Sequence, residues 1–501
     1  RLAEEGWALR ADSLERQGRA GAEDAAWWRR LCESAQGLPG FEAWGALHDV
    51  SQLIVMTATF TLLGRSLGDA GYGRYAGLYG IVGPIGGLTW SGICLCVLQR
   101  RLREGDDIST VARKVTLMSL TLGLVGLAIG TLVGAATIGG TLVVTVTAVM
   151  FAELVANGVN QVLFAMVQAE KGFAVATRLR MVVLAIRVTT VLTLFTAGRL
   201  SVDPGATAAE ARDAASHAIG YLAGGYSIGF LVYLAVLITT ILPRHGIPFV
   251  LRRPDASTTK LTAQFSLPIA VGVLQQDGDK TVLNSYGYHA EAGLYAAAFR
   301  VVAMGLMPLR ALEGAAFQRF LPHNENERNE HTRRAFRYSV LALGISLVIG
   351  VGIFICTPLI SVILGDDFAK AEAIVPWLLP FLPLTAVSNA PSNGLLGLGK
   401  LGVRFGIYAA GAVVSLTLYI TMIPLMPAGE PWKGAVIGTI VGEAFLTIAG
   451  WVALRHYQQR HNATLDAPPS EPSPDSWADP QPPPPYVGPL PVRQASTPQD
   501  R

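Results

Sequence analysis

The stretch "SVLALGISLVIGVGIFICTPLISVI", Ser339–Ile363, contains no charged side chain. As a helix it is long enough to cross the hydrocarbon core of a bilayer, which takes about 20 residues. Similar apolar runs recur from residue 44 to residue 454. Backbone groups in lipid must be bonded within the protein, so repeated runs of this kind predict a bundle of helices. The sequence therefore predicts an all-α polytopic membrane protein.

The composition agrees with a membrane protein. Of the 501 residues, 51% are hydrophobic and 15% are charged, whereas soluble domains carry about 25% charged residues. The 54 glycines suit membrane helices, which approach closely through small residues. A net charge of +3 argues for no nucleic-acid partner, and the four cysteines predict no disulfide framework. We find no metal-ligand cluster, nucleotide-binding loop or nucleophile elbow in the sequence.

We expect about twelve transmembrane helices in two six-helix lobes. The third and fourth are separated only by Gly139–Gly140, so a tight hairpin there is the weakest of the predicted breaks. The predicted division is a cytoplasmic N-terminal extension (1–43), an N-lobe with spans 1–6 (44–242), a cytoplasmic linker (243–262), a C-lobe with spans 7–12 (263–454) and a Pro-rich disordered cytoplasmic tail (455–501). The spans lie near 44–64, 76–98, 115–136, 139–162, 181–198, 218–242, 263–285, 292–316, 339–363, 374–396, 405–427 and 434–454.

The basic residues indicate the orientation in the membrane. Loops after the even-numbered spans carry roughly three times as many Lys and Arg residues as the other loops, which favours a cytoplasmic location for them and for both termini. The N-terminal extension reads either as an interfacial helix or as a solvated extension. In the tail, "PPPPY" resembles a ligand for proline-recognising modules, and a plain flexible tail is the alternative.

A short element is repeated before the second and the eighth spans. The sequence reads "GRYAGLY" at Gly73–Tyr79 and "GLYAAAF" at Gly293–Phe299, with Gly-x-Tyr-Ala in common. With six spans in each half, this repeat predicts two pseudo-symmetric lobes. Two such lobes facing each other form the cleft of an alternating-access transporter.

Charged residues interrupt the seventh span in "VGVLQQDGDKTVLN", Val271–Asn284. At 100° per residue its polar side chains fall within an arc of about 200°. A charge at the bilayer centre costs at least about 2.5–3.5 kcal/mol, so it normally faces a cavity or a partner. The alternative is that this end of the span lies at the outer interface, where the charges are wet.

Further charges lie in the middle of other spans. An arginine fork holds phosphate through two parallel hydrogen bonds and stays charged, so arginines lining a cleft suit a diphosphate. The alternative for each is an ion pair that joins two helices. We assign a substrate-binding role, as a hypothesis, to Arg187, Arg300, Lys280, Gln276 and Arg310. Ion coupling is assigned to Asp277, Asp279, Glu153 and Glu443.

Several segments resemble one family. "LGRSLGDAGYGRYAGLYGIVGPIGGLTWSGI", "LQQDGDKTVLNSYGYHAEAGLYAAAFRV", "TPLISVILGDDFAKAEAIVPWLLP" and "NGLLGLGKLGVRFGIYAAGAVVSLTLYITMIPL" are similar to the polysaccharide (Wzx-like, O-antigen-type) flippases of the multidrug/oligosaccharidyl-lipid/polysaccharide (MOP) exporter superfamily. The resemblance covers roughly residues 45–455. It implies a V-shaped, MATE-like fold in the cell membrane. It also implies transfer of an undecaprenyl-diphosphate-linked saccharide from the cytoplasmic to the outer leaflet.

The resemblance implies partners as well as a substrate. We expect a lipid-linked glycan, membrane lipids and the polymerase or glycosyltransferase machinery of polysaccharide synthesis, with no cofactor and with H⁺ or Na⁺ as the coupling ion. The alternatives are a cation-coupled multidrug antiporter of the same superfamily and a polytopic enzyme or scaffold of surface-polysaccharide synthesis. We expect Arg300→Ala or Arg187→Ala to leave folding largely intact and to stop the accumulation of surface polysaccharide.

Overall fold

The computed structural model describes residues 41–139, 141–202, 207–317 and 330–466, and within these ranges it contains helices and no strand. The first half holds α3 (Phe41–Gly86), α4 (Gly92–Leu98), α5 (Ile108–Thr137), α6 (Val143–Met150), α7 (Gly158–Lys171), α8 (Phe173–Thr196), α9 (Ala208–Val236) and α10 (Leu242–Arg244). The second half holds α11 (Ala256–Ser285), α12 (His289–Met304), α13 (Leu306–Phe317), α14 (Glu330–Cys356), α15 (Leu359–Leu364), α16 (Ala371–Leu378), α17 (Phe381–Gly397), α18 (Leu401–Met422) and α19 (Trp432–Asp466).

Nine helical segments of the described chain are long and apolar enough to cross a membrane. The first, Val50–Leu102, contains most of the first predicted span and all of the second. A kink at Gly68 separates the two. Gly68 has a φ of 65°, a left-handed conformation that glycine adopts readily. The seventh and eighth predicted spans are helical but are not among the nine. α11 is long enough but too polar, whereas α12 and α13, with 16 and 12 residues, are each too short. The prediction of an all-α polytopic protein is confirmed for the described residues.

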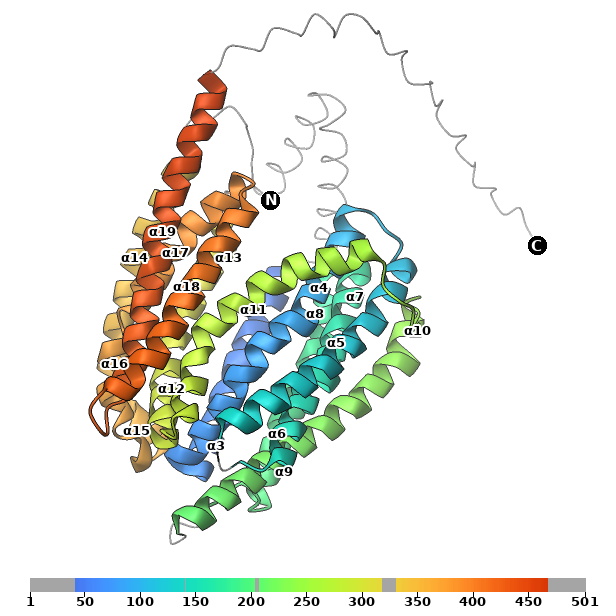
Figure 1. Ribbon diagram of the computed structural model, residues 1–501. Helices are drawn as coiled ribbons and strands as arrows, with labels where there is room; N and C mark the ends of the chain where they lie inside the picture. The colour runs from blue at the N-terminus through green and yellow to red at the C-terminus, as the bar shows by residue number, and fades with distance from the viewer. Residues whose placement is uncertain (1–40, 140, 203–206, 318–329, 467–501) are drawn as a thin grey trace, which may run out of the picture.

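The helices form two bundles in a V (Figure 1). One contains α4–α10, the other contains α13–α19, and α3, α11 and α12 form the main contact between them. We call the end of the molecule where α3 begins and α19 finishes the terminal end, and the opposite end the closed end. The bundles meet at the closed end and diverge toward the terminal end (Figure 1).

The two copies of the repeated element meet each other at the closed end. A Cβ on Gly73 would collide with the carbonyl oxygen of His289, and a Cβ on Gly293 would collide with that of Asp69. Each glycine therefore packs against the backbone four residues before the other glycine. This reciprocal contact is what a pseudo-two-fold axis between the repeats produces.

Several helices extend beyond the predicted spans, among them α11 at its start and α19 at its end. α11 begins at Ala256, before the apolar run, because the Asp255 side chain caps it by accepting a hydrogen bond from the Thr258 N–H at 2.8 Å. α19 continues to Asp466, so residues 455–466 are helical, although we assigned them to the disordered tail. The other predictions for the tail and those for residues 1–40 lie outside the described residues.

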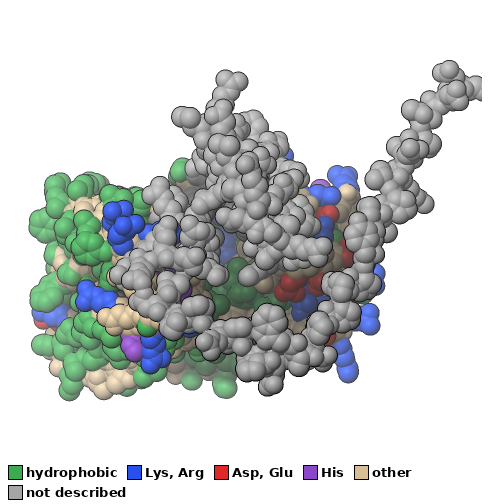
Figure 2. Space-filling view, turned by 90° about the horizontal axis from the view of Figure 1, so that it is seen from above, with side chains coloured by type: hydrophobic (Ala, Val, Ile, Leu, Met, Phe, Trp, Pro, Cys, Tyr) green, Lys and Arg blue, Asp and Glu red, His purple; other side chains and the backbone are tan. Residues whose placement is uncertain are grey.

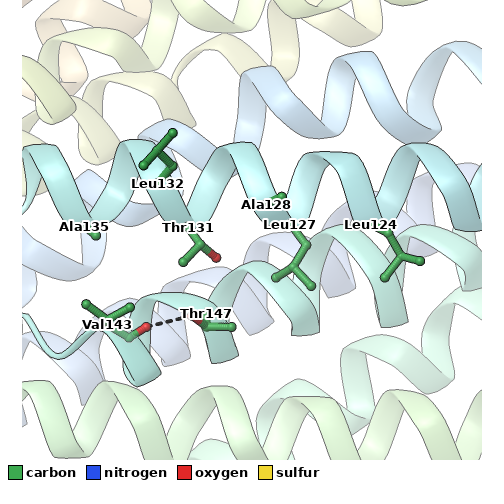
Figure 3. Close-up of a pocket in the computed structure, with 8 residues that line it drawn as sticks. All are labelled: Leu124, Leu127, Ala128, Thr131, Leu132, Ala135, Val143 and Thr147. Carbon is green, nitrogen blue, oxygen red and sulfur yellow. Dashed lines mark hydrogen bonds between the residues drawn. The ribbon is translucent and has the colours of Figure 1, made fainter.

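The outer surface is apolar on its flanks. Figure 2, which views the molecule from the terminal end, shows Lys and Arg side chains on both bundles and many apolar side chains on the left-hand flank. A furrow of about 440 Å³ runs between α5 and α6 and is lined mainly by aliphatic side chains such as Leu124, Leu132 and Val143 (Figure 3). In this furrow the Thr147 hydroxyl donates to the Val143 carbonyl of its own helix. These features suit a surface that faces lipid.

Candidate functional site

A buried ion pair lies in the first bundle. Arg187 on α8 reaches the Oε2 of Glu153 at 2.7 Å. The same carboxylate accepts hydrogen bonds from the Tyr79 hydroxyl at 2.7 Å and from the Asn157 amide at 3.1 Å. Glu153 and Asn157 belong to a π-helical segment, Phe151–Asn157, between α6 and α7. Segments of this kind are frequent at functional sites.

This ion pair joins two residues to which the sequence analysis gave different roles. We proposed Arg187 for substrate binding and Glu153 for ion coupling, and the structure joins them directly. The guanidinium also lies 5.1 Å from the ring centre of Tyr226 and 5.2 Å from that of Phe230. The helix-joining alternative for Arg187 therefore describes its contacts. Its binding role and the coupling role of Glu153 stay predictions.

A second charged cluster lies in the C-terminal third of α11. The Lys280 ammonium is 2.8 Å from Asp277 Oδ1 and 3.1 Å from Asp279 Oδ1. Asp279 is fully buried and accepts from the Tyr295 hydroxyl at 2.5 Å. Tyr295 also lies 3.1 Å from the Thr439 hydroxyl of α19.

This burial decides between the two explanations of the charged stretch. Asp279 and Lys280 are buried among protein side chains, so they are not wet residues at an interface. Asp277 alone of the three charged groups is exposed, with 39% of its side chain accessible. Asp279 joins α11 to α12, whereas the Lys280 ion pairs lie within α11. These contacts do not test a role in ion coupling.

Arg300 lies between the two bundles. It is half-buried on α12, its guanidinium lies 6.0 Å from the ring centre of Phe60, and it interacts with the hydroxyl of Tyr72 on α3. Within the described residues it has no carboxylate within ion-pair distance. Arg300 thus forms no ion pair there, unlike Arg187 and Lys280, although the carboxylate of Asp277 acts on its charge from beyond that distance.

A row of tyrosines on α3 connects the arginine positions. The ring centres of Tyr72 and Tyr75 are 6.0 Å apart, and those of Tyr75 and Tyr79 are 4.6 Å apart. Arg300 approaches the row at Tyr72, and the Arg187–Glu153 pair meets it at Tyr79. The sequence analysis missed this row, although "YGRYAGLY" places a tyrosine at every third or fourth residue, which is the spacing of one helix face.

Gln276 and Arg310 both line a polar cavity of about 190 Å³. This cavity adjoins the charged cluster of α11, because the Gln276 carbonyl accepts a hydrogen bond from the Lys280 ammonium at 3.0 Å. The cavity is on the C-lobe side, between α11, α13, α14 and α17, and Glu313, Thr385 and Asn389 also line it. Glu443 is buried behind Thr385 and accepts from the Ser388 hydroxyl at 3.3 Å. No Lys or Arg of the described chain pairs with Glu443. The structure thus places the predicted site residues in several clusters rather than around one cavity.

The fold and the spans are those of a known class of multi-pass membrane proteins. The structure is similar to a multidrug-resistance MATE-family transporter of the MOP superfamily in an inward-facing conformation, with a TM-score of 0.60 and 16% identity over 82% of this chain and 96% of that chain. The outward-facing conformation of such a transporter matches with a TM-score of 0.55 and 14% identity, over 83% and 94%. A MOP-superfamily transporter from Pyrococcus furiosus, whose binding pocket is described as having reverse polarity, gives 0.53 and 14%, over 82% and 94%.

The family is more specific than this class. The model of the polysaccharide biosynthesis protein family matches residues 44–317, which is more than half of the chain, and the protein belongs to that family. No curated protein matches the chain. Family and fold together indicate a multi-pass membrane protein of polysaccharide biosynthesis that has the fold of MOP-superfamily transporters.

Proposed function

We propose that this protein transfers a saccharide linked to an undecaprenyl-diphosphate-type lipid from the cytoplasmic to the outer leaflet of the cell membrane. The terminal end is then cytoplasmic, because the loops rich in Lys and Arg lie there. The closed end faces outward. Membership of the polysaccharide biosynthesis family and the MOP fold support this function.

Arg300 is the observation that carries the proposal. A half-buried guanidinium between two lobes, with no carboxylate partner in the described chain, is an unused site for an anion. Its fork suits the paired oxygens of a diphosphate. The tyrosines beside it offer ring faces and hydroxyls but no negative charge.

The arrangement accounts for a transport cycle. The diphosphate enters from the terminal end and binds at Arg300, while the polyprenyl chain stays in the lipid outside. Release of the reciprocal glycine contact at the closed end, together with closure of the terminal end, then exposes the same site to the other side. H⁺ or Na⁺ as driving ion and an association with the synthesis machinery are parts of the proposal that await their own tests.

The experiment compares three variants in cells that depend on this transporter. Arg300→Ala should abolish surface polysaccharide and cause lipid-linked precursor to accumulate, measured by mass spectrometry of extracted lipids. Arg300→Lys should retain partial export, because it keeps the charge and loses the fork. Arg199→Ala is the control, since Arg199 is exposed after α8 and only overlies Tyr221. Normal export by Arg300→Ala at normal protein level would refute the assignment.

A further inference from the structure

The polar cavity between α11, α13, α14 and α17 contains side chains whose hydrogen-bonding capacity is unused. The Thr385 hydroxyl is more than nine-tenths buried and faces the Glu443 carboxylate, without a hydrogen bond of standard geometry in the described structure. The Gln276 amide likewise has no side-chain hydrogen bond there, and Arg310 has no ion pair there. Buried polar groups are normally paired with protein or with a ligand or water.

The charge on the cavity wall is fixed in place. Glu313 accepts from the amide of Asn389 at 3.1 Å and from the amide of Asn393 at 3.0 Å. Both bonds come from α17, so the carboxylate of α13 is held against that helix and keeps further lone pairs for other donors. The cavity therefore offers acceptors at Glu313, a donor and acceptors at Thr385, and both at Gln276.

We propose that this cavity is the subsite for the sugar ring nearest the diphosphate, and that it takes a neutral ring with free hydroxyls. This inference rests on the proposed function. A volume of about 190 Å³ corresponds to roughly six waters of liquid, which suits one ring rather than an oligosaccharide. A hydroxyl both donates and accepts, as the wall requires.

The negative charge of Glu313 disfavours a sugar ring that carries a carboxylate. A sugar carboxylate would lie beside Glu313, which already receives two amide hydrogen bonds and has no cation within ion-pair distance in the described chain. Arg310 is exposed at the same cavity and is free to meet the phosphate that joins the ring to its lipid. Tyr338 adds an apolar ring to the wall.

The test measures binding to the purified full-length protein in lipid nanodiscs. The probes are undecaprenyl diphosphate alone and the same lipid bearing glucose, galactose, N-acetylglucosamine or glucuronic acid. At least one neutral sugar should bind about tenfold more tightly than the bare lipid, the gain expected from one or two net hydrogen bonds. Glucuronic acid should give no such gain.

Two variants test whether the gain in affinity from the sugar comes from this cavity. Thr385→Val and Asn389→Leu should each remove most of the tenfold difference and leave the affinity for the bare lipid unchanged. Thr447→Val is the matched control: its hydroxyl lies on α19 near the same helix, donates to the Leu384 and Glu443 carbonyls, and does not line the cavity. It should keep the full difference.

The outcomes separate this inference from the function on which it rests. If the bare lipid diphosphate binds but no neutral sugar adds affinity, the cavity holds only water and the inference is wrong. If the gain survives both Thr385→Val and Asn389→Leu, the sugar binds elsewhere and the inference is again wrong. If no lipid diphosphate binds at all, the proposed function itself fails.

Discussion

The Arg187–Glu153 pair determines what a single substitution at either residue does. Breaking a buried ion pair typically costs about 3–5 kcal/mol, because the remaining charge is left without its partner. The Arg187 side chain is 21% exposed, so we expect the lower end of this range. In Arg187→Ala, Glu153 would stay buried without its cation, so this ion pair argues for a loss of stability where the sequence alone predicts largely intact folding.

A double-mutant cycle tests this pair. Glu153→Gln and Arg187→Gln should each lower the Tm of the purified protein, and the double variant should lose less than the two single losses added together. The measurement is thermal unfolding followed by tryptophan fluorescence. Additive losses, or single variants with the wild-type Tm, would show that the two side chains do not stabilise each other.

For single residues, the sequence predicted which charged side chains lie within the spans but not which side chains they contact. Glu153 and Arg187 stand out because charge is rare in an apolar run, and that signal needs only the chain itself. Their contact spans 34 residues and depends on how α8 packs on the π-helical segment, which hydropathy does not encode. Glu313 escaped notice because it lies near the end of a span, where charge is ordinary.

At the scale of elements, the start of α11 depends on one aspartate. Lys114 lies 2.8 Å from Asp255, and this contact together with the Thr258 hydrogen bonds holds the pKa of the Asp255 carboxyl well below its usual range. A depressed folded-state pKa stabilises the fold above the unfolded pKa of about 4, and this stability is lost as the pH falls further. Hydropathy alone does not predict this first turn of α11, because the turn is polar and precedes the apolar run.

Asp255 therefore predicts a local effect on α11. Asp255→Ala should weaken the first turn by about 1 kcal/mol and speed amide hydrogen exchange there, whereas Asp255→Asn should keep the cap and lose only the contact with Lys114. In the wild type, the protection factors of the same amides, which correct for the intrinsic exchange rates, should fall once the pH drops below about 4. Equal protection in Asp255→Ala and the wild type would disprove the capping role.

The glycines of the repeat give a prediction about the junction of α3 and α12. Gly293→Ala places a methyl group against the Asp69 carbonyl, so it should push the lobes apart at the closed end. Gly272→Ala on α11 is the control, because a Cβ there meets nothing within 4 Å. Spin labels at Thr196→Cys and Ala428→Cys, in an otherwise cysteine-free protein, report the separation. Gly293→Ala should lengthen the mean distance, and an unchanged distance distribution would contradict the proposed packing.

For the whole molecule, the repeat and the even span count predicted two matched halves, and the MOP fold confirms them. That the repeats touch each other did not follow from their likeness, because sequence similarity between segments does not say that they are neighbours. We expected the charged residues to line one cleft, whereas the structure places them in several clusters. Arg187 and Lys280 have carboxylate partners, while Arg300 lies between the bundles without one in the described chain.

The most direct test of the account is transport by the purified protein in liposomes. Undecaprenyl-diphosphate–N-acetylglucosamine is placed in one leaflet, and its arrival in the other leaflet is followed by a galactosyltransferase added outside. The wild type and Arg199→Ala should make the lipid accessible far faster than protein-free vesicles do, and Arg300→Ala should match the protein-free rate. Equal rates with and without the wild-type protein would contradict the account.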